Sequence, residues 1–263
     1  LLNSGAFQAY NLRLEHLALA CASHAGERVH TDIIAQWLRQ LSLGPKDLAC
    51  GPHMPTDPQT QIAMIRQNEK PTALHNNCSG KHTGLLCACR HLKISVHDYH
   101  LLDHPAQILL KKQLEESLED SLNSYGIDGC SLPAFQTSFQ SLARAFARMA
   151  ASAQDNTKSN EALILRAFLE HPVLTSGHEK FAAKLMQANP GKVLIKTGAE
   201  GVLVASIPLK RMGIIVKARD GADRASQVAL DHLLQRFAGL DGALETRLFN
   251  YAGTIVGDYR VEI

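Results

Sequence analysis

The stretch from His75 to Gly84 is dense in side chains that can do chemistry, since it holds a thiol, an amine and two imidazoles. Asn76, Asn77 and Ser79 are good N-cap residues, and Gly80 permits a sharp turn, so the stretch is expected to begin a helix. Unpaired backbone N–H groups at a helix N-terminus stabilise a thiolate or a bound anion. We therefore expect part of an active site here. The alternative is a well-capped helix start without chemistry.

Cys78 and Lys81 lie three residues apart and share one face if the helix has already begun there. No second Cys-x-x-Cys or His-x-His pair follows, which excludes a zinc finger. A further metal ligand would have to come from a distant segment. The loop Asp128 to Pro133 is the candidate donor, because it is bounded by Gly and Pro and presents Asp128 and Cys130. A purely structural loop cysteine is the alternative.

Two further segments carry a serine and a lysine. Cys21-Ala-Ser-His24 follows an apolar run and is expected to place Ser23 and His24 at the edge of a pocket, although adjacent Ser and His residues are not a catalytic dyad by themselves. Lys196-Thr-Gly198 ends a β-rich run and matches the edge-strand motif of penicillin-recognising serine enzymes. A solvated strand lysine before a turn is the alternative.

The elements that must position these residues follow from the spacing of apolar side chains. Helical spacing predicts helices over Thr31–Leu43, Gly84–Leu92, Pro105–Leu122, Phe139–Ala151, Asn160–Leu169, Glu179–Ala188 and Asp223–Phe237. Three β-rich runs with short connections, 193–197, 202–207 and 213–218, predict an antiparallel meander. The polar stretch 151–160 is expected to be a loop. The order of these elements predicts an α+β fold without alternating βαβ units.

Composition narrows the class of protein further. The chain has 263 residues, 45% hydrophobic residues and a formal net charge of +2 without any polybasic stripe, which favours a small-molecule ligand over nucleic acid. No apolar run approaches the roughly 20 residues of a bilayer span, and no signal-peptide pattern opens the chain. We expect a cytoplasmic protein with no membrane partner. Its six irregularly spaced cysteines are expected to be reduced thiols.

Five motifs in register resemble the asparaginase II family, the group that includes the Rhizobium-type L-asparaginases. They are Cys21-Ala-Ser-His, Asn77-Cys-Ser-Gly-Lys-His, Asp103-His-Pro, Asp128-Gly-Cys-Ser-Leu-Pro and Lys196-Thr-Gly-Ala. The resemblance implies a fold related to serine β-lactamases and glutaminases, and hydrolysis of L-asparagine to aspartate and ammonia. We expect one domain over residues 1–263, with a helical lobe at 31–190 and a sheet lobe at 191–240.

The same resemblance implies roles for individual residues. Ser23 and Lys196 match one of the two catalytic serine and lysine pairs. The positions that match the family's Zn²⁺ ligands are Cys78, Lys81 and Cys130. The substrate pocket is expected to include His24, Asn77, His82, Asp128 and Gly198. A lysine ligand must be a neutral amine, so metal binding should weaken in acid. A homodimer is expected, because symmetric dimers are the commonest oligomers.

One part of the family pattern has no match in this chain. The family's first nucleophile lies in a Ser-x-x-Lys motif just before the segment that matches residues 1–10, so the sequence is expected to be truncated at its N-terminus. Two other functions stay open: a catalytically inactive amino-acid-binding module, and another penicillin-recognising type of serine hydrolase. Asparagine and glutamine are not distinguished, because one methylene changes discrimination by only about 1 to 3 kcal/mol.

Overall fold

A three-stranded antiparallel sheet lies at the centre of the computed structural model, which describes residues 1–262. Its strands are β3 (Leu194–Gly198), β4 (Val202–Ile207) and β5 (Met212–Lys217), in the order β3-β4-β5. The register pairs Lys196 with Val204 and Val202 with Lys217. The predicted meander is therefore confirmed, and the Lys-Thr-Gly motif ends an edge strand as expected.

Helices make up most of the rest, so the α+β class is confirmed. In chain order the α-helices are α1 (Ala6–Ala9), α2 (Leu14–Ala20), α3 (Arg28–Gln40), α4 (Pro58–Arg66), α5 (Ser79–Leu92), α6 (Pro105–Leu118), α7 (Phe139–Asp155), α8 (Asn160–Glu170), α9 (Pro172–Thr175), α10 (Phe181–Ala188) and α11 (Asp223–Leu233). Short 3₁₀ turns occur at η1 (Pro45–Asp47), η2 (Ala73–His75) and η3 (Pro208–Lys210), and a π-helical turn, η4 (Leu234–Ala238), extends α11.

Each predicted helix is present, with shifted ends. The polar stretch 151–160 was expected to be a loop throughout, but α7 continues to Asp155 because its apolar face still packs on the sheet. The N-cap of α5 is Cys78, and neither Asn76, Asn77 nor Ser79 takes that place. Asn76 instead accepts the Cys78 N–H from within the preceding turn, at 2.9 Å.

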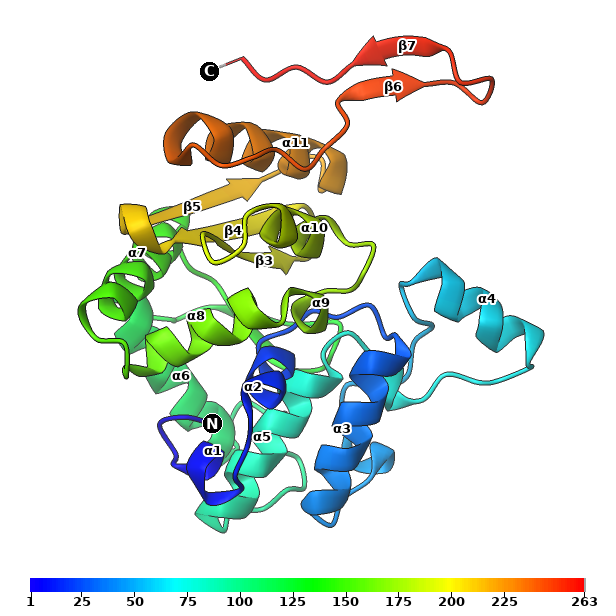
Figure 1. Ribbon diagram of the computed structural model, residues 1–263. Helices are drawn as coiled ribbons and strands as arrows, with labels where there is room; N and C mark the ends of the chain where they lie inside the picture. The colour runs from blue at the N-terminus through cyan, green and yellow to red at the C-terminus, as the bar shows by residue number, and fades with distance from the viewer. Residues whose placement is uncertain (263) are drawn as a thin grey trace.

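Two short hairpins were not predicted. The strands β1 (Tyr125–Ile127) and β2 (Pro133–Phe135) flank the Asp128 loop, and β6 (Arg247–Phe249) pairs with β7 (Ile255–Asp258). These strands are three or four residues long, too short to display a period of two. The β6–β7 hairpin and α4 both project from the main body (Figure 1).

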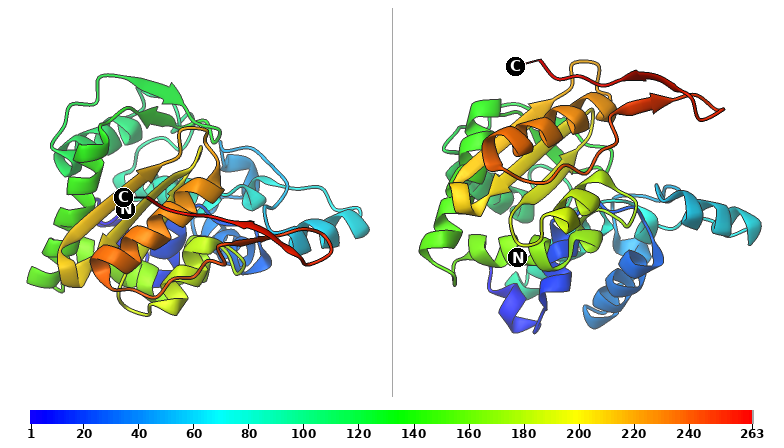
Figure 2. Two further views of the ribbon diagram at one scale, coloured as in Figure 1. Left: turned by 90° about the horizontal axis from the view of Figure 1, so that it is seen from above. Right: turned by 45° about the horizontal axis from the view of Figure 1, so that its top comes forward.

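The two faces of the sheet are covered by different helices. Figures 1 and 2 show α11 on one face, with α7 and α8 on the other. Gly213 of β5 makes the α7 contact possible, because a Cβ there would lie 2.1 Å from the Ala143 carbonyl oxygen. The central strand β4 is buried from Leu203 to Ile207, as expected for a strand covered on both faces.

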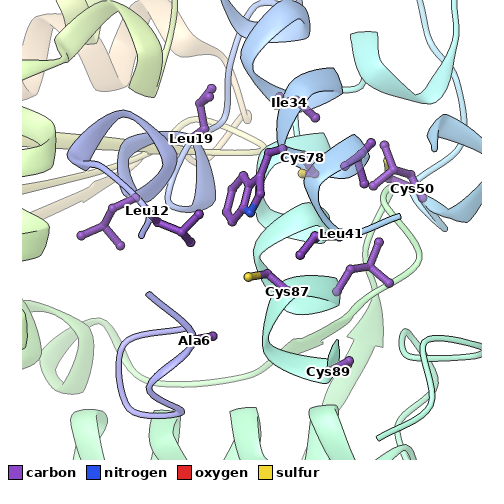
Figure 3. Close-up of a cluster of buried hydrophobic side chains, with 14 of the residues drawn as sticks. Ala6, Leu12, Leu19, Ile34, Leu41, Cys50, Cys78, Cys87 and Cys89 are labelled. Atoms are coloured by element: carbon purple, nitrogen blue, oxygen red, sulfur yellow. The ribbon is translucent and has the colours of Figure 1, made fainter. Parts of the chain in front are cut away.

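A second cluster of buried side chains surrounds α5. Cys78, Cys87 and Cys89 lie along this helix among apolar side chains from α2 and α3 (Figure 3). Burial of Cys87 and Cys89 as small apolar groups is confirmed, since both are 0% exposed. All six cysteines are free thiols. None of the helices within residues 1–262 has the length and apolar character that a bilayer span requires.

The N-terminus of α5 meets α2 at unusually close range. A Cβ on Gly80 would lie 2.3 Å from the Leu19 carbonyl oxygen, and one on Gly84 would lie 3.2 Å from Ala20 Cβ. Glycine at both positions lets the two helices touch through their backbones. This contact brings the chain that leaves α2, with Ser23, against the first turn of α5.

Candidate functional site

Segments that are far apart in the sequence meet at the N-terminus of α5. Ser23 lies in the connection between α2 and α3, and its N–H donates to the Thr175 carbonyl at 3.2 Å. The next N–H, of His24, donates to the Asn77 carbonyl at 3.1 Å. Asn77 Nδ2 also donates to Ser23 Oγ at 3.1 Å. Asn77 therefore holds Ser23 through its side chain and the next residue, His24, through its backbone carbonyl.

The side chain of His24 is buried beneath this connection and forms hydrogen bonds to two neighbouring segments. Its Nδ1 accepts the Gly26 N–H at 3.1 Å, and its Nε2 lies 2.9 Å from Ser79 Oγ. Burial, followed by the neighbouring imidazoles of His30 and His53, lowers the pKa of His24 well below its usual range, so the ring is neutral. With an exposed fraction of 1%, the side chain faces the interior. A direct contact with substrate stays a prediction.

Two thiols and a carboxylate form the candidate metal centre. The Sγ atoms of Cys78 and Cys130 and a carboxylate oxygen of Asp128 all lie within 4.8 Å of one another. Asp128 and Cys130 come from the β1–β2 hairpin loop, where Cys130 Sγ lies 3.3 Å from Asp128 Oδ2. Two cysteines and a carboxylate are donors that Zn²⁺ accepts. This group could hold a metal ion.

The two thiols differ in acidity because they share a hydrogen bond. The Cys130 thiol and, more weakly, the Lys81 ammonium lower the pKa of Cys78 to about 7, against the effect of burial. The same hydrogen bond and burial raise the pKa of Cys130 to about 12. The pair therefore loses its first proton near neutral pH and keeps the second until a cation binds.

Lys81 borders this group from the first turn of α5. Its Nζ lies 3.9 Å from Asp128 Oδ2, and the side chains of both residues are part-exposed, at 37% and 42%. Burial lowers the pKa of Lys81, but the charges of Cys78, Cys130 and Asp128 outweigh burial and leave the pKa raised. Lys81 is thus an ammonium at neutral pH, and it would have to release a proton to bind a metal.

His82 closes the buried side of the centre. Its Nδ1 lies 2.6 Å from the Tyr99 hydroxyl, which also accepts the Ala49 N–H. The hydroxyl can donate to Nδ1, and that arrangement places the ring proton on Nε2. Within residues 1–262 the buried Nε2 of His82 has no hydrogen-bond partner of good geometry. The His82 side chain nevertheless lowers the pKa of the Cys130 thiol. An imidazole N–H facing a thiol fits a site in which that thiol becomes a thiolate.

Lys196 projects from β3 toward the same centre. Burial and then the positive charge of Lys81 lower the pKa of Lys196 to about 8, while Cys78 and Asp128 act in the opposite direction. Its Nζ donates to the Thr197 carbonyl, and no hydrogen bond to Ser23 occurs within the described residues. Gly198 ends the strand at the exposed rim. Lys196 is therefore an amine that loses its proton unusually easily.

Sequence reasoning missed two supporting residues, His53 and Tyr99. Tyr99 is 2% exposed and orients His82. His53 Nε2 accepts the Asn77 N–H at 3.0 Å. Its sequence neighbourhood, Gly51-Pro-His-Met-Pro55, has the same Gly and Pro bounded character that singled out the Asp128 loop, so the signal was present.

The chain matches a known protein family. A sequence profile of the family described as L-asparaginase II matches residues 1–259. No curated protein sequence matches the chain significantly. Because the family match spans nearly all of the sequence and includes every segment of the site, the chain belongs to the L-asparaginase II family.

Proposed function

We propose that the protein hydrolyses the side-chain amide of L-asparagine, giving L-aspartate and ammonia. Family membership supports amidohydrolase chemistry. The observation that carries the proposal is the lowered pKa of Lys196, about 8, in a chain whose Ser23 is held by a hydrogen bond from Asn77. With a pKa of about 8, Lys196 is mostly an ammonium at pH 7, and it can supply the nearby positive charge that keeps a second, catalytic lysine neutral.

The proposed reaction runs through an acyl-enzyme. A serine Oγ attacks the amide carbon, the carbon–nitrogen bond breaks, and ammonia leaves with the proton taken from the hydroxyl. Water then cleaves the ester and releases aspartate. In the family pattern the attacking serine belongs to a Ser-x-x-Lys segment. Ser23 then passes the proton, and Lys196 supplies a second positive charge that keeps the first lysine neutral.

The remaining residues are assigned to substrate and metal. Asp128, an exposed carboxylate at the rim, suits the substrate's α-ammonium group. Cys78, Lys81 and Cys130 are the proposed Zn²⁺ ligands, and the acidic Cys78 thiol and the buried His82 N–H support that assignment. When bound, zinc would supply a Lewis acid or a charge that shapes the pocket. Asn77 and Gly198 complete the pocket wall.

Separate alanine variants of the proposed pair test this function. Ser23→Ala and Lys196→Ala, made in the full-length protein, are each expected to lower the rate of ammonia release from asparagine by at least about a hundredfold. Ser95→Ala, an exposed serine in the loop between α5 and α6, is the matched control and should keep the parental rate. Activity within about twofold of the parent in both variants would remove the pair from the mechanism.

A second serine hydrolase activity is favoured by one observation, the Lys-Thr-Gly motif at the end of the edge strand β3. The β-lactam nitrocefin tests it directly, because hydrolysis of this substrate is not expected of an asparaginase. Calorimetric binding of asparagine without any ammonia release would instead indicate an inactive amino-acid-binding module.

A further inference from the structure

His53 lies between η1 and α4, outside the motifs that identify the family, and it is half-buried. Two of its contacts are short: Nδ1 lies 2.6 Å from the Met54 carbonyl oxygen, and Nε2 accepts the Asn77 N–H at 3.0 Å. The ring therefore joins the 51–57 segment to the turn that precedes α5.

These two partners fix the tautomer of the ring. A carbonyl oxygen can only accept, so Nδ1 must carry the proton, and a backbone N–H can only donate, so Nε2 must be bare. Free imidazole side chains favour the opposite tautomer, with the proton on Nε2. The Nδ1–H form of His53 is thus imposed by its surroundings, as a second group imposes the tautomer in many functional sites.

Asn77 links His53 to Ser23 through hydrogen bonds. Its N–H is held by His53, its carbonyl accepts the His24 N–H at 3.1 Å, and its Nδ2 donates to Ser23 Oγ at 3.1 Å. Asn77 thus contacts the Ser23 connection twice, and it contacts His53 through its N–H and, at the longer distance of 3.4 Å, through its Oδ1. Loss of the contacts to His53 would leave Asn77 free to rotate with Ser23 rather than hold it.

We propose that His53 is a positioning residue for Ser23, acting through the hydrogen bond from the Asn77 N–H to its Nε2. The proposal rests on the proposed amidohydrolase function, because the rate of that reaction is what the position of Ser23 controls. His53 contacts Asn77 and not Ser23, so it belongs to the support of the site and takes no part in bond making.

Two substitutions at His53 separate this role from a general effect on folding. His53→Leu removes the acceptor while keeping a similar volume, and His53→Gln returns an acceptor, its Oε1, near the position of Nε2. We expect the Leu variant to lose about tenfold to a hundredfold in kcat with KM within about threefold, as misplaced catalytic groups do. The Gln variant should recover most of kcat. His97→Leu, an exposed histidine between α5 and α6, is the matched control and should keep the parental values.

An activity-independent measurement keeps this proposal distinct from the proposed function. Nitrogen NMR of the parent should show a protonated Nδ1 and a bare Nε2 in His53, and His53→Leu should shift the Asn77 amide proton upfield. If the parent releases no ammonia, the proposed function fails, and these spectra alone decide the tautomer and the contact.

Three results would overturn the proposal. The first is parental kcat in a folded His53→Leu variant. The second is an equal loss of kcat in the Leu and Gln variants. The third is an Nε2-protonated ring in the parent, which also decides the matter if the Leu variant does not fold.

Discussion

The buried charge of Lys196 is expected to lower the free energy of unfolding at neutral pH, although the proposed reaction requires this residue. Its pKa falls from 10.5 to about 8, chiefly through burial and then through Lys81. At 1.36 kcal/mol for each pKa unit, holding the proton at pH 7 costs the folded protein about 3 kcal/mol. Lys196→Met removes this cost but also the hydrogen bond to the Thr197 carbonyl, worth about 1 kcal/mol. We therefore expect the variant to be inactive and more stable by about 2 kcal/mol.

The pH dependence of that difference tests its cause. Between the folded pKa of about 8 and the unfolded value of 10.5, the unfolded chain binds more protons, so the free energy of unfolding of the parent rises with pH. The gain in the free energy of unfolding of Lys196→Met over the parent should be largest below pH 8 and should disappear toward pH 10.5. Urea unfolding across this range, at constant metal content, measures it.

Lys217→Met is the matched control, because Lys217 lies on β5 and its Nζ also donates to the next residue's carbonyl. Its stability should change by less than about 1 kcal/mol. Destabilisation of Lys196→Met by a pH-independent amount would show that burial does not oppose the charge of Lys196. Retained activity would remove Lys196 from the mechanism.

Three further outcomes follow from the geometry of the site. Gly80→Ala places a Cβ 2.3 Å from the Leu19 carbonyl and should lower the free energy of unfolding by about 3 kcal/mol, whereas Gly129→Ala, with no atom within 4 Å, should be nearly neutral in the same urea experiment. Asp128→Asn should raise KM for asparagine about tenfold and leave the zinc content unchanged; loss of zinc in elemental analysis would instead make Asp128 a ligand. Because the pKa of Cys78 is about 7, zinc affinity should fall at least about tenfold for each pH unit below 7, and a pH-independent affinity in competition with a chelator would contradict this ligand.

The sequence by itself determined the long helices, the meander and most of the residues that meet at the site. A helix such as α7 or a strand such as β4 repeats its apolar spacing often enough to be recognised locally. The β1–β2 hairpin has no such repetition, although it delivers Cys130. Its existence depends on packing against distant parts of the chain, which local spacing does not record.

Only the tertiary structure decided how the candidate residues act. Lys81 and Lys196 are both lysines near the same thiols, yet one pKa is raised and the other is lowered, because they differ in burial and in the charges around them. His53 is one of 13 histidines in the sequence, and although Gly and Pro residues bound its loop, nothing in its spacing relates it to Asn77. Residue type and spacing are local properties, whereas burial, hydrogen-bond partners and the electrostatic field at an atom are sums over the whole folded chain.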